Sequence, residues 1–115
     1  MIVKALSIRQ PFSTLILTGE KVEEFRSWYT HHRGPLAVHA GSTLARDAFD
    51  AHPHLSPAKV KRGVILGVVD VTDCVEEVYG GYAWILARPR WLKQAIPLKG
   101  RLGLFDVEIS DHLLE

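Results

Sequence analysis

The sequence contains a single cysteine, Cys74, and this scarcity excludes two kinds of stabilising site. One thiol cannot form an intramolecular disulfide, and it cannot supply a cysteine-rich zinc site. Cys74 lies in an apolar, strand-like run, so we expect a small buried hydrophobic side chain rather than a nucleophile. Six histidines are present, but they include no His-x-x-x-His helical pair, so we expect no metal site and no cofactor.

The sequence also lacks a long hydrophobic run and an excess of charge of one sign. No apolar run approaches the roughly 18 residues of a membrane-spanning helix, and residues 1–4 do not resemble a signal peptide, so we expect a cytoplasmic protein without a membrane partner. With a formal net charge of +1, no global basic field points to a nucleic-acid partner. Basic residues do form local groups, which is compatible with one basic face. The two groups are Lys59, Lys61 and Arg62, and Arg88, Arg90, Lys93, Lys99 and Arg101.

The composition is that of an ordinary globular chain, with 47% hydrophobic and 23% charged residues among 115. That length suits a single domain, residues 1–115, with one core. Runs of β-branched and alternating residues predict strands, and a proline followed by apolar residues at helical spacing predicts a helix at 11–18. The predicted strands are 2–8, 22–27, 35–40, 64–75, 82–87 and 102–109, a second helix is predicted at 44–51, and residues 88–101 are predicted to form a loop.

These elements predict an α+β fold with a mixed or antiparallel sheet of about six strands and two or three helices. Many short strands in a small domain expose sheet edges, and closure into a small β-barrel would remove them. Residues 64–71 have apolar side chains on both faces and are expected to form a central buried strand. Within this strand, Gly67 indicates a bulge or a close approach of another part of the chain.

The most polar stretch, residues 19–28, follows the first predicted helix. We expect Gly19 to end that helix in the left-handed conformation, which a Cβ atom disfavours. Side chains alternate along a strand, so Glu24 and Arg26 lie on one face of the extended segment that follows. We expect an ion pair between them, with Lys21 close enough to join. Both a solvated, self-neutralising edge strand and a binding site account for such a cluster of mixed charge.

Several aromatic and charged side chains are candidates for ligand contacts. Base stacking on aromatic rings beside Arg or Lys is how proteins hold single strands and splayed bases. Aromatic residues in strands also fill cores, and we expect a core position for Trp84. Lys21 is the candidate reactive group, because a partly desolvated lysine near carboxylates can act as a base. The aromatic candidates are Trp28, Tyr29, Tyr82, Trp84 and Trp91.

Three segments of the chain carry a family resemblance. They are Ala5-Leu6-Ser7-Ile8-Arg9-Gln10-Pro11, then Gly19-x-Lys21-x-x-Glu24-x-Arg26-Ser27-Trp28, then Arg33-Gly34-Pro35-Leu36-x-x-His39-Ala40. The chain resembles the ASCH domain, the activating-signal-cointegrator homology family, whose signature is the G-x-K-x-x-E-x-R string. Later segments agree, so the match covers nearly the whole chain in order: Gly67-Val68-Val69-Asp70 with Asp73-Cys74, Tyr82-x-Trp84, and Ile96-Pro97-x-x-Gly100-Arg101-Leu102-Gly103-Leu104-Phe105.

The resemblance implies a fold similar to the PUA-like β-barrel, an RNA-binding architecture, with the signature lining a cleft. It also implies a partner, which would be RNA, another single-stranded nucleic acid, or a nucleoside-like small molecule. The residues expected to contact that ligand are Arg9, Gln10, Lys21, Glu24, Arg26, Ser27, Trp28, His39 and Tyr82.

One branch of the resembled family is a hydrolase that removes the acetyl group of N4-acetylcytidine with a Lys base, a Thr nucleophile and a Glu. Lys21 matches the Lys position, but Glu24 stands where that branch has its Thr, and Asp70 or Asp73 could stand for the downstream acid. Ribonuclease activity is also associated with the family, and Glu24 as base with Lys21 and Arg26 as charge stabilisers would support it. The catalytic residues of such an enzyme would be Lys21 and Glu24. Three classes of function therefore stay open: a nucleic-acid binding module, a hydrolase, and an interaction domain without nucleic acid.

Overall fold

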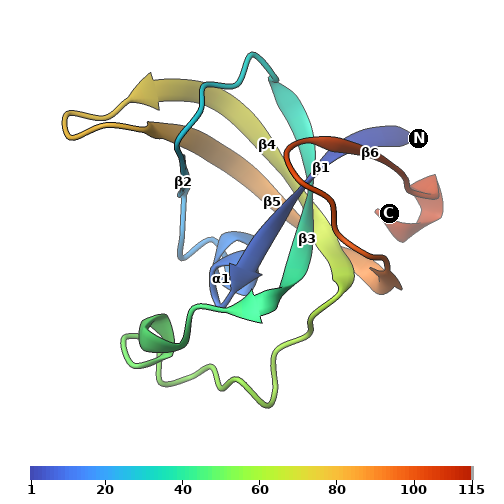
Figure 1. Ribbon diagram of the computed structural model, residues 1–115. Coiled ribbons are helices and arrows are strands. Elements are labelled where there is room, and N and C mark those ends of the chain that lie inside the picture. The colour runs from blue at the N-terminus through green and yellow to red at the C-terminus, as the bar shows by residue number, and fades with distance from the viewer. Residues whose placement is uncertain (115) are drawn as a thin grey trace.

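The computed structural model describes residues 1–114, and its six strands form one mixed sheet (Figure 1). β1 and β3 pair in parallel, and the other neighbouring strands pair antiparallel. The predicted α+β class, with about six strands in a mixed sheet, is therefore confirmed. In sheet order, the strands are β2 (Glu23–Arg26), β5 (Tyr82–Pro97), β4 (Val64–Glu76), β3 (Gly34–Leu44), β1 (Ile2–Gln10) and β6 (Phe105–Glu108).

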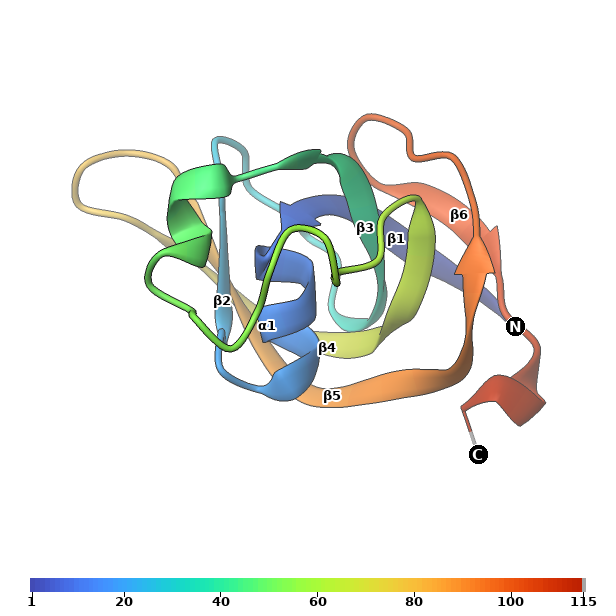
Figure 2. The ribbon, with the colours of Figure 1, turned by 90° about the horizontal axis from the view of Figure 1, so that it is seen from below.

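The sheet is strongly curved, and α1 (Phe12–Thr18) lies inside the curve (Figure 2). Leu15, Ile16 and Leu17 are buried there, and the helix contacts β1, β3, β4 and β5. Within residues 1–114 the sheet ends at β2 and β6, and no strand pairing joins these two edges. The predicted closure into a barrel is therefore not confirmed. No helix in this part of the chain has the length and apolar character needed to cross a membrane.

The second predicted helix, at 44–51, is wrong. β3 continues to Leu44, and only a short 3₁₀ turn, η1 (Arg46–Phe49), follows it. Leu44 pairs with Gln10 at the end of β1, and the amide of Ala45 donates to the carbonyl of Gln10 at 2.8 Å. Pairing with β1 thus keeps the chain extended through Leu44, the first residue of the predicted helix. With a second 3₁₀ turn, η2 (Asp111–Leu113), residues 1–114 contain one α-helix rather than the predicted two or three.

The predicted loop at 88–101 is wrong for residues 88–97, which extend β5. Arg88 has a positive φ of 53°, and Arg88 and Pro89 lie where the register between β4 and β5 shifts. An inserted residue at a bulge leaves the hydrogen-bond ladder locally unpaired, so a proline is tolerated there. The bulge therefore allows a strand to pass through a sequence that contains Pro89. Of the strand predicted at 102–109, only β6 pairs with β1.

The buried strand and the core confirm several predictions. Ile65–Val69 of β4 is buried, and β4 lies between β3 and β5. Trp84 is fully buried and Cys74 is buried, as expected. A Cβ atom at Gly67 would lie 2.3 Å from both the carbonyl oxygen of Arg90 and Cδ1 of Leu17, which confirms the predicted close approach. Gly19 has a φ of 85° and is the C-cap of α1.

Candidate functional site

A cavity of about 780 Å³ lies where β1, α1 and β2 meet. We call it the signature cavity, because its wall includes Lys21, Glu24 and Arg26. Its volume is in the range of small-molecule and cofactor sites. β2 is one edge strand of the sheet, and β1 lies next to the other edge strand, β6. The curl of the sheet nevertheless brings β1 close to β2. The charged residues of β2 therefore share the cavity with residues of β1, a strand that is distant from β2 in the order of the sheet.

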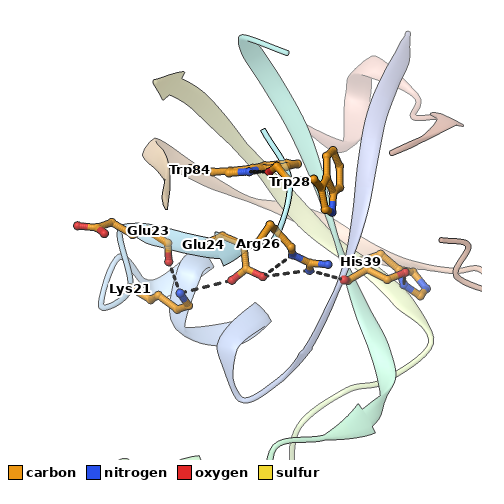
Figure 3. A network of polar contacts seen from close by, with 8 residues as sticks. Lys21, Glu23, Glu24, Arg26, Trp28, His39 and Trp84 are labelled. Carbon is orange, nitrogen blue, oxygen red and sulfur yellow. Dashed lines mark hydrogen bonds and ion pairs between the residues drawn. The ribbon is translucent and has the colours of Figure 1, made fainter. Parts of the chain in front are cut away.

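The carboxylate of Glu24 is at the centre of the polar contacts in the cavity (Figure 3). Its Oε2 accepts a hydrogen bond from Nε of Arg26 at 3.0 Å, and Nη2 of Arg26 lies 3.0 Å from the same oxygen in an ion pair. Its Oε1 lies 3.4 Å from Nζ of Lys21. Glu24 is only 7% exposed, so these contacts compensate for the removal of a charge from water. The ion pair predicted between Glu24 and Arg26, with Lys21 joining it, is confirmed.

Backbone and aromatic contacts hold Lys21 in place. Its amide donates to the carbonyl of Leu15 at 3.0 Å, just after Gly19 ends the helix. Its ammonium group donates to the carbonyl of Glu23 and lies 5.6 Å and 5.0 Å from the ring centres of Phe12 and Phe25. Both distances are within the range of cation–π attraction. The lysine is therefore an ordered part of the cavity wall rather than a mobile surface charge.

Arg26 joins β2 to β1 and keeps free donors. Its Nη2 also donates to the carbonyl of Ser7 in β1, at 2.8 Å. Of its five N–H groups, the two on Nη1 have no hydrogen-bond partner among residues 1–114. Glu24 Oε1 has only the longer contact to Lys21, so it can accept a further hydrogen bond. The cavity, whose wall also includes Phe12 and Phe25, therefore offers donors and an acceptor on neighbouring side chains.

A buried hydrogen-bond chain runs from Ser7 through His39 to Leu98. Nε2 of His39 lies 2.6 Å from the carbonyl oxygen of Leu98, and Nδ1 lies 2.8 Å from Oγ of Ser7. A carbonyl oxygen only accepts, so Nε2 carries the proton and donates. In the neutral ring Nδ1 is then the acceptor, and the Ser7 hydroxyl donates to it. Ser7 lines the signature cavity, whereas His39 does not and lines a neighbouring hollow instead.

The structure brings some of the predicted ligand residues to the signature cavity and leaves others outside it. Gln10 is fully buried: its Nε2 donates to the carbonyl of Lys61 at 2.8 Å, and its Oε1 accepts from the amide of Thr14 at 3.1 Å. Gln10 thus ties the first turn of α1 to the chain before β4. Of the predicted ligand residues, those that line the cavity are Arg9, Lys21, Glu24, Arg26 and Ser27.

Trp28 and Tyr82 lie beyond the cavity and pack against other aromatic rings. The rings of Trp28 and Trp84 meet edge to face at 4.8 Å, and Nε1 of Trp84 donates to the carbonyl of Trp28 at 3.3 Å. Tyr82 makes a similar contact with Tyr29 at 5.6 Å. These contacts hold the chain in place just after β2 ends at Arg26. A ligand contact by Trp28 or Tyr82 stays a prediction.

Asp70 and Asp73, the candidates for a downstream acid, do not line the signature cavity. Asp70 accepts hydrogen bonds from Arg88 at 2.7 Å and from Arg90 at 3.0 Å. Burial by itself raises the pKa of Asp70, but the two arginines outweigh this and hold the pKa below its ordinary value. Asp73 Oδ1 accepts from the amide of Cys74. Within residues 1–114, no group of three or more His, Cys, Asp or Glu side chains is placed to hold a metal ion.

Sequence reasoning missed Ser7, Phe12 and Phe25 as residues of the cavity wall. Ser7 is two positions from Arg9 on β1, so strand alternation could have indicated that both face the same side. Helical spacing places Phe12 on the apolar face of the first helix, and strand alternation places Phe25 on the face of β2 opposite Glu24. Phe25 is 59% exposed yet still borders the cavity, because the cavity lies at the edge of the sheet.

Comparison with known proteins identifies the family of the chain. The family model of the ASCH domain matches residues 6–105. Two relatives named Activating signal cointegrator 1, from Homo sapiens and Mus musculus, are each 27% identical over an alignment that covers 93% of this chain. The chain spans 22% of the length of each relative. Because the family model covers most of the chain, including the whole signature cavity, the chain belongs to the ASCH domain family.

Proposed function

We propose that this protein binds single-stranded nucleic acid, in the first place RNA, and that the signature cavity takes an unstacked base. The observation that carries the proposal is the ordered Lys21–Glu24–Arg26 cluster at the wall of a cavity with aromatic sides. Single-stranded RNA is recognised by bases that stack on aromatic rings and form hydrogen bonds through their edges. The curved six-stranded sheet supports the PUA-like architecture that the resemblance implies.

The chemistry of the cluster fits a base edge better than a phosphate. Lys21 and Arg26 are both engaged by Glu24, so the cluster is not strongly positive. Base edges present donors beside acceptors, and carboxylate and guanidinium groups read such edges in many complexes. Glu24 Oε1 would accept from an amino or imino group, and Nη1 of Arg26 would donate to a neighbouring acceptor. Phe12 and Phe25 supply the apolar surface for the faces of the ring.

A titration of fluorescently labelled single-stranded RNA at several salt concentrations tests the proposal. Each phosphate contact should contribute about −0.7 to the log–log slope of affinity against salt. The double substitution Lys21→Ala with Arg26→Ala should weaken binding. This variant leaves Glu24 buried without its partners, so Phe25→Ala, which alters an exposed ring, is the second variant. Arg46→Ala with Lys59→Ala, two exposed residues outside the cavity, is the control of equal charge change.

Several outcomes of this titration would contradict the proposal. Binding that does not depend on salt would argue against a nucleic-acid ligand held by phosphate contacts. Binding that survives both Phe25→Ala and the Lys21/Arg26 double substitution would argue against the signature cavity. No binding of RNA or of DNA of the same sequence would favour an interaction domain without nucleic acid.

A hydrolase acting on RNA or on N4-acetylcytidine is the second candidate function. The observation that favours it is the contact between Nζ of Lys21 and Oε1 of Glu24, 3.4 Å apart inside a cavity of ligand size. In this case Lys21 or Glu24 would move a proton, and Arg26 would stabilise negative charge that develops on the substrate. Turnover that is lost in Lys21→Ala would support this function over simple binding.

A further inference from the structure

A second hollow, of about 670 Å³, adjoins the signature cavity. The two share Ser7 and Arg9, so one ligand can extend from one into the other. We call the second hollow the basic groove, because its wall includes Arg9, Lys99 and Arg101 and no aspartate or glutamate. The two hollows thus differ in charge: the acidic residues Glu20 and Glu24 line only the signature cavity.

The segment that carries Lys99 and Arg101 is anchored at Leu98, just before Lys99. The carbonyl of Leu98 accepts from Nε2 of His39, and the amide of Leu98 donates to the carbonyl of Gly63 at 3.0 Å. Gly100 lies directly on the buried chain of Ser7 and His39. A Cβ atom at position 100 would lie 2.4 Å from Oγ of Ser7 and 2.8 Å from Cε1 of His39. Because Gly100 has no side chain, the backbone between Lys99 and Arg101 can pack directly against Ser7 and His39.

The cations of the basic groove have no acidic partner within residues 1–114. Arg9, Lys99 and Arg101 are exposed and form no ion pair with an aspartate or glutamate there. Arg88 and Arg90, in contrast, are paired with Asp70. Unneutralised cations on an anchored backbone attract an anion, and they lose little conformational freedom of the main chain when the anion binds.

From these contacts we propose that the basic groove binds a phosphate of the same nucleotide strand whose base enters the signature cavity. This inference rests on the proposed function and adds a second subsite to it. Arg9, which lines both hollows, would lie at the junction of base and phosphate. Lys99 and Arg101 would bind the phosphate oxygens. The ligand is thus a single-stranded nucleotide unit that is recognised through its base and its phosphate at two different places.

Nuclear magnetic resonance titrations with nucleosides and with the matching nucleoside 5′- and 3′-monophosphates test the groove directly. A nucleoside should shift the resonances of Lys21 and Ser27 in the signature cavity and leave those of Gly63 and Gly100 in place. At least one monophosphate should shift both sets and bind more tightly. Equal affinity of nucleoside and both monophosphates, with Gly63 and Gly100 unshifted, would overturn the inference.

Substitutions separate the failure of the groove from the failure of the proposed function. Lys99→Ala with Arg101→Ala should lower RNA affinity by about 25-fold at ~0.1 M salt, since two contacts change the salt slope by about 1.4. Nucleoside binding should stay unchanged in this variant. Arg46→Ala with Lys59→Ala is the matched control. If RNA binds but the Lys99/Arg101 variant and the Arg46/Lys59 control lose affinity equally, the groove inference is wrong and the proposed function stands. If the unmodified protein binds neither RNA nor DNA of the same sequence, both the groove inference and the proposed function are wrong.

Discussion

The guanidinium group of Arg26 holds the carboxylate of Glu24 through two nitrogens, Nε and Nη2, each 3.0 Å from Oε2. The two residues lie two positions apart on β2, and Nη2 also reaches the carbonyl of Ser7 on β1. This contact links an edge strand of the sheet to a distant strand, and it orients the free donors of Arg26. The pair is therefore a structural connection between β2 and β1.

Removal of the Glu24 charge should destabilise the protein. In Glu24→Gln the side chain keeps its size, but Arg26 and Lys21 lose their charged partner in a site that is only 7% exposed. Hydrogen bonds to charged groups contribute about 1.5–3 kcal/mol, so we expect a loss of this size in the free energy of unfolding. Urea denaturation measures it. Glu23→Gln, which alters a neighbouring carboxylate without an ion pair among residues 1–114, is the control, and an equal loss in both variants would contradict the role of Glu24.

The unmodified protein should deacetylate N4-acetylcytidine weakly or not at all. Both oxygens of Glu24 are engaged by Arg26 and Lys21, and a carboxylate so held is a poor nucleophile towards an amide. Glu24→Thr places a hydroxyl 3 positions after Lys21, as in the hydrolase branch, and should raise the rate of release of cytidine and acetate, which chromatography follows. Lys21→Ala in that background is the control. Efficient turnover by the unmodified protein that Glu24→Ala leaves unchanged would exclude Glu24 from the site.

Stability should fall at acidic pH through Asp70. The pKa of Asp70 is below its ordinary value of 3.8, because hydrogen bonds from Arg88 and Arg90 outweigh the effect of burial. A lowered pKa stabilises the folded state at pH values above 3.8, and this stabilisation is lost as the pH falls through the lowered pKa. Asp70→Asn should therefore be less stable at pH 7, by about 1–3 kcal/mol, and the difference should shrink towards pH 2.

Chemical denaturation at a series of pH values measures the effect of Asp70→Asn. Asp106→Asn is the matched control, since Asp106 pairs with Lys4 on the surface, where its side chain is 60% exposed. An exposed pair contributes about 0–1 kcal/mol. A difference between Asp70→Asn and the unmodified protein that stays constant from pH 7 to pH 2 would show a loss of packing rather than of charge.

Gly67→Ala should destabilise the fold by about 1–3 kcal/mol, the usual cost of overpacking a core. The added Cβ would meet the carbonyl oxygen of Arg90 and Cδ1 of Leu17, each at 2.3 Å, so β5 or α1 has to move. Thermal or urea denaturation measures the change. Gly41→Ala is the control, because its Cβ would have only ordinary contacts, the nearest at 3.7 Å. Equal stability of the Gly67→Ala variant and the unmodified protein would show that this contact relaxes without cost.

The parts of the structure that follow from short-range rules could be predicted from the sequence. The alternation of side chains along a strand is enough to place Glu24 and Arg26 together, and the helix end at Gly19 brings Lys21 beside them. The apolar run at residues 64–71 likewise predicts a buried central strand, because both of its faces are apolar. In each case the deciding interaction joins residues a few positions apart.

The parts that depend on distant partners could be decided only by the tertiary structure. β3 stays extended as far as Leu44 because Leu44 pairs with Gln10 at the end of β1, and β5 passes through Pro89 because a bulge against β4 accommodates it. The chain from Ser7 through His39 to Leu98 joins residues 32 and 59 positions apart. No local pattern marks these contacts, because they arise from the curvature of the whole sheet, which brings the signature cavity and the basic groove side by side.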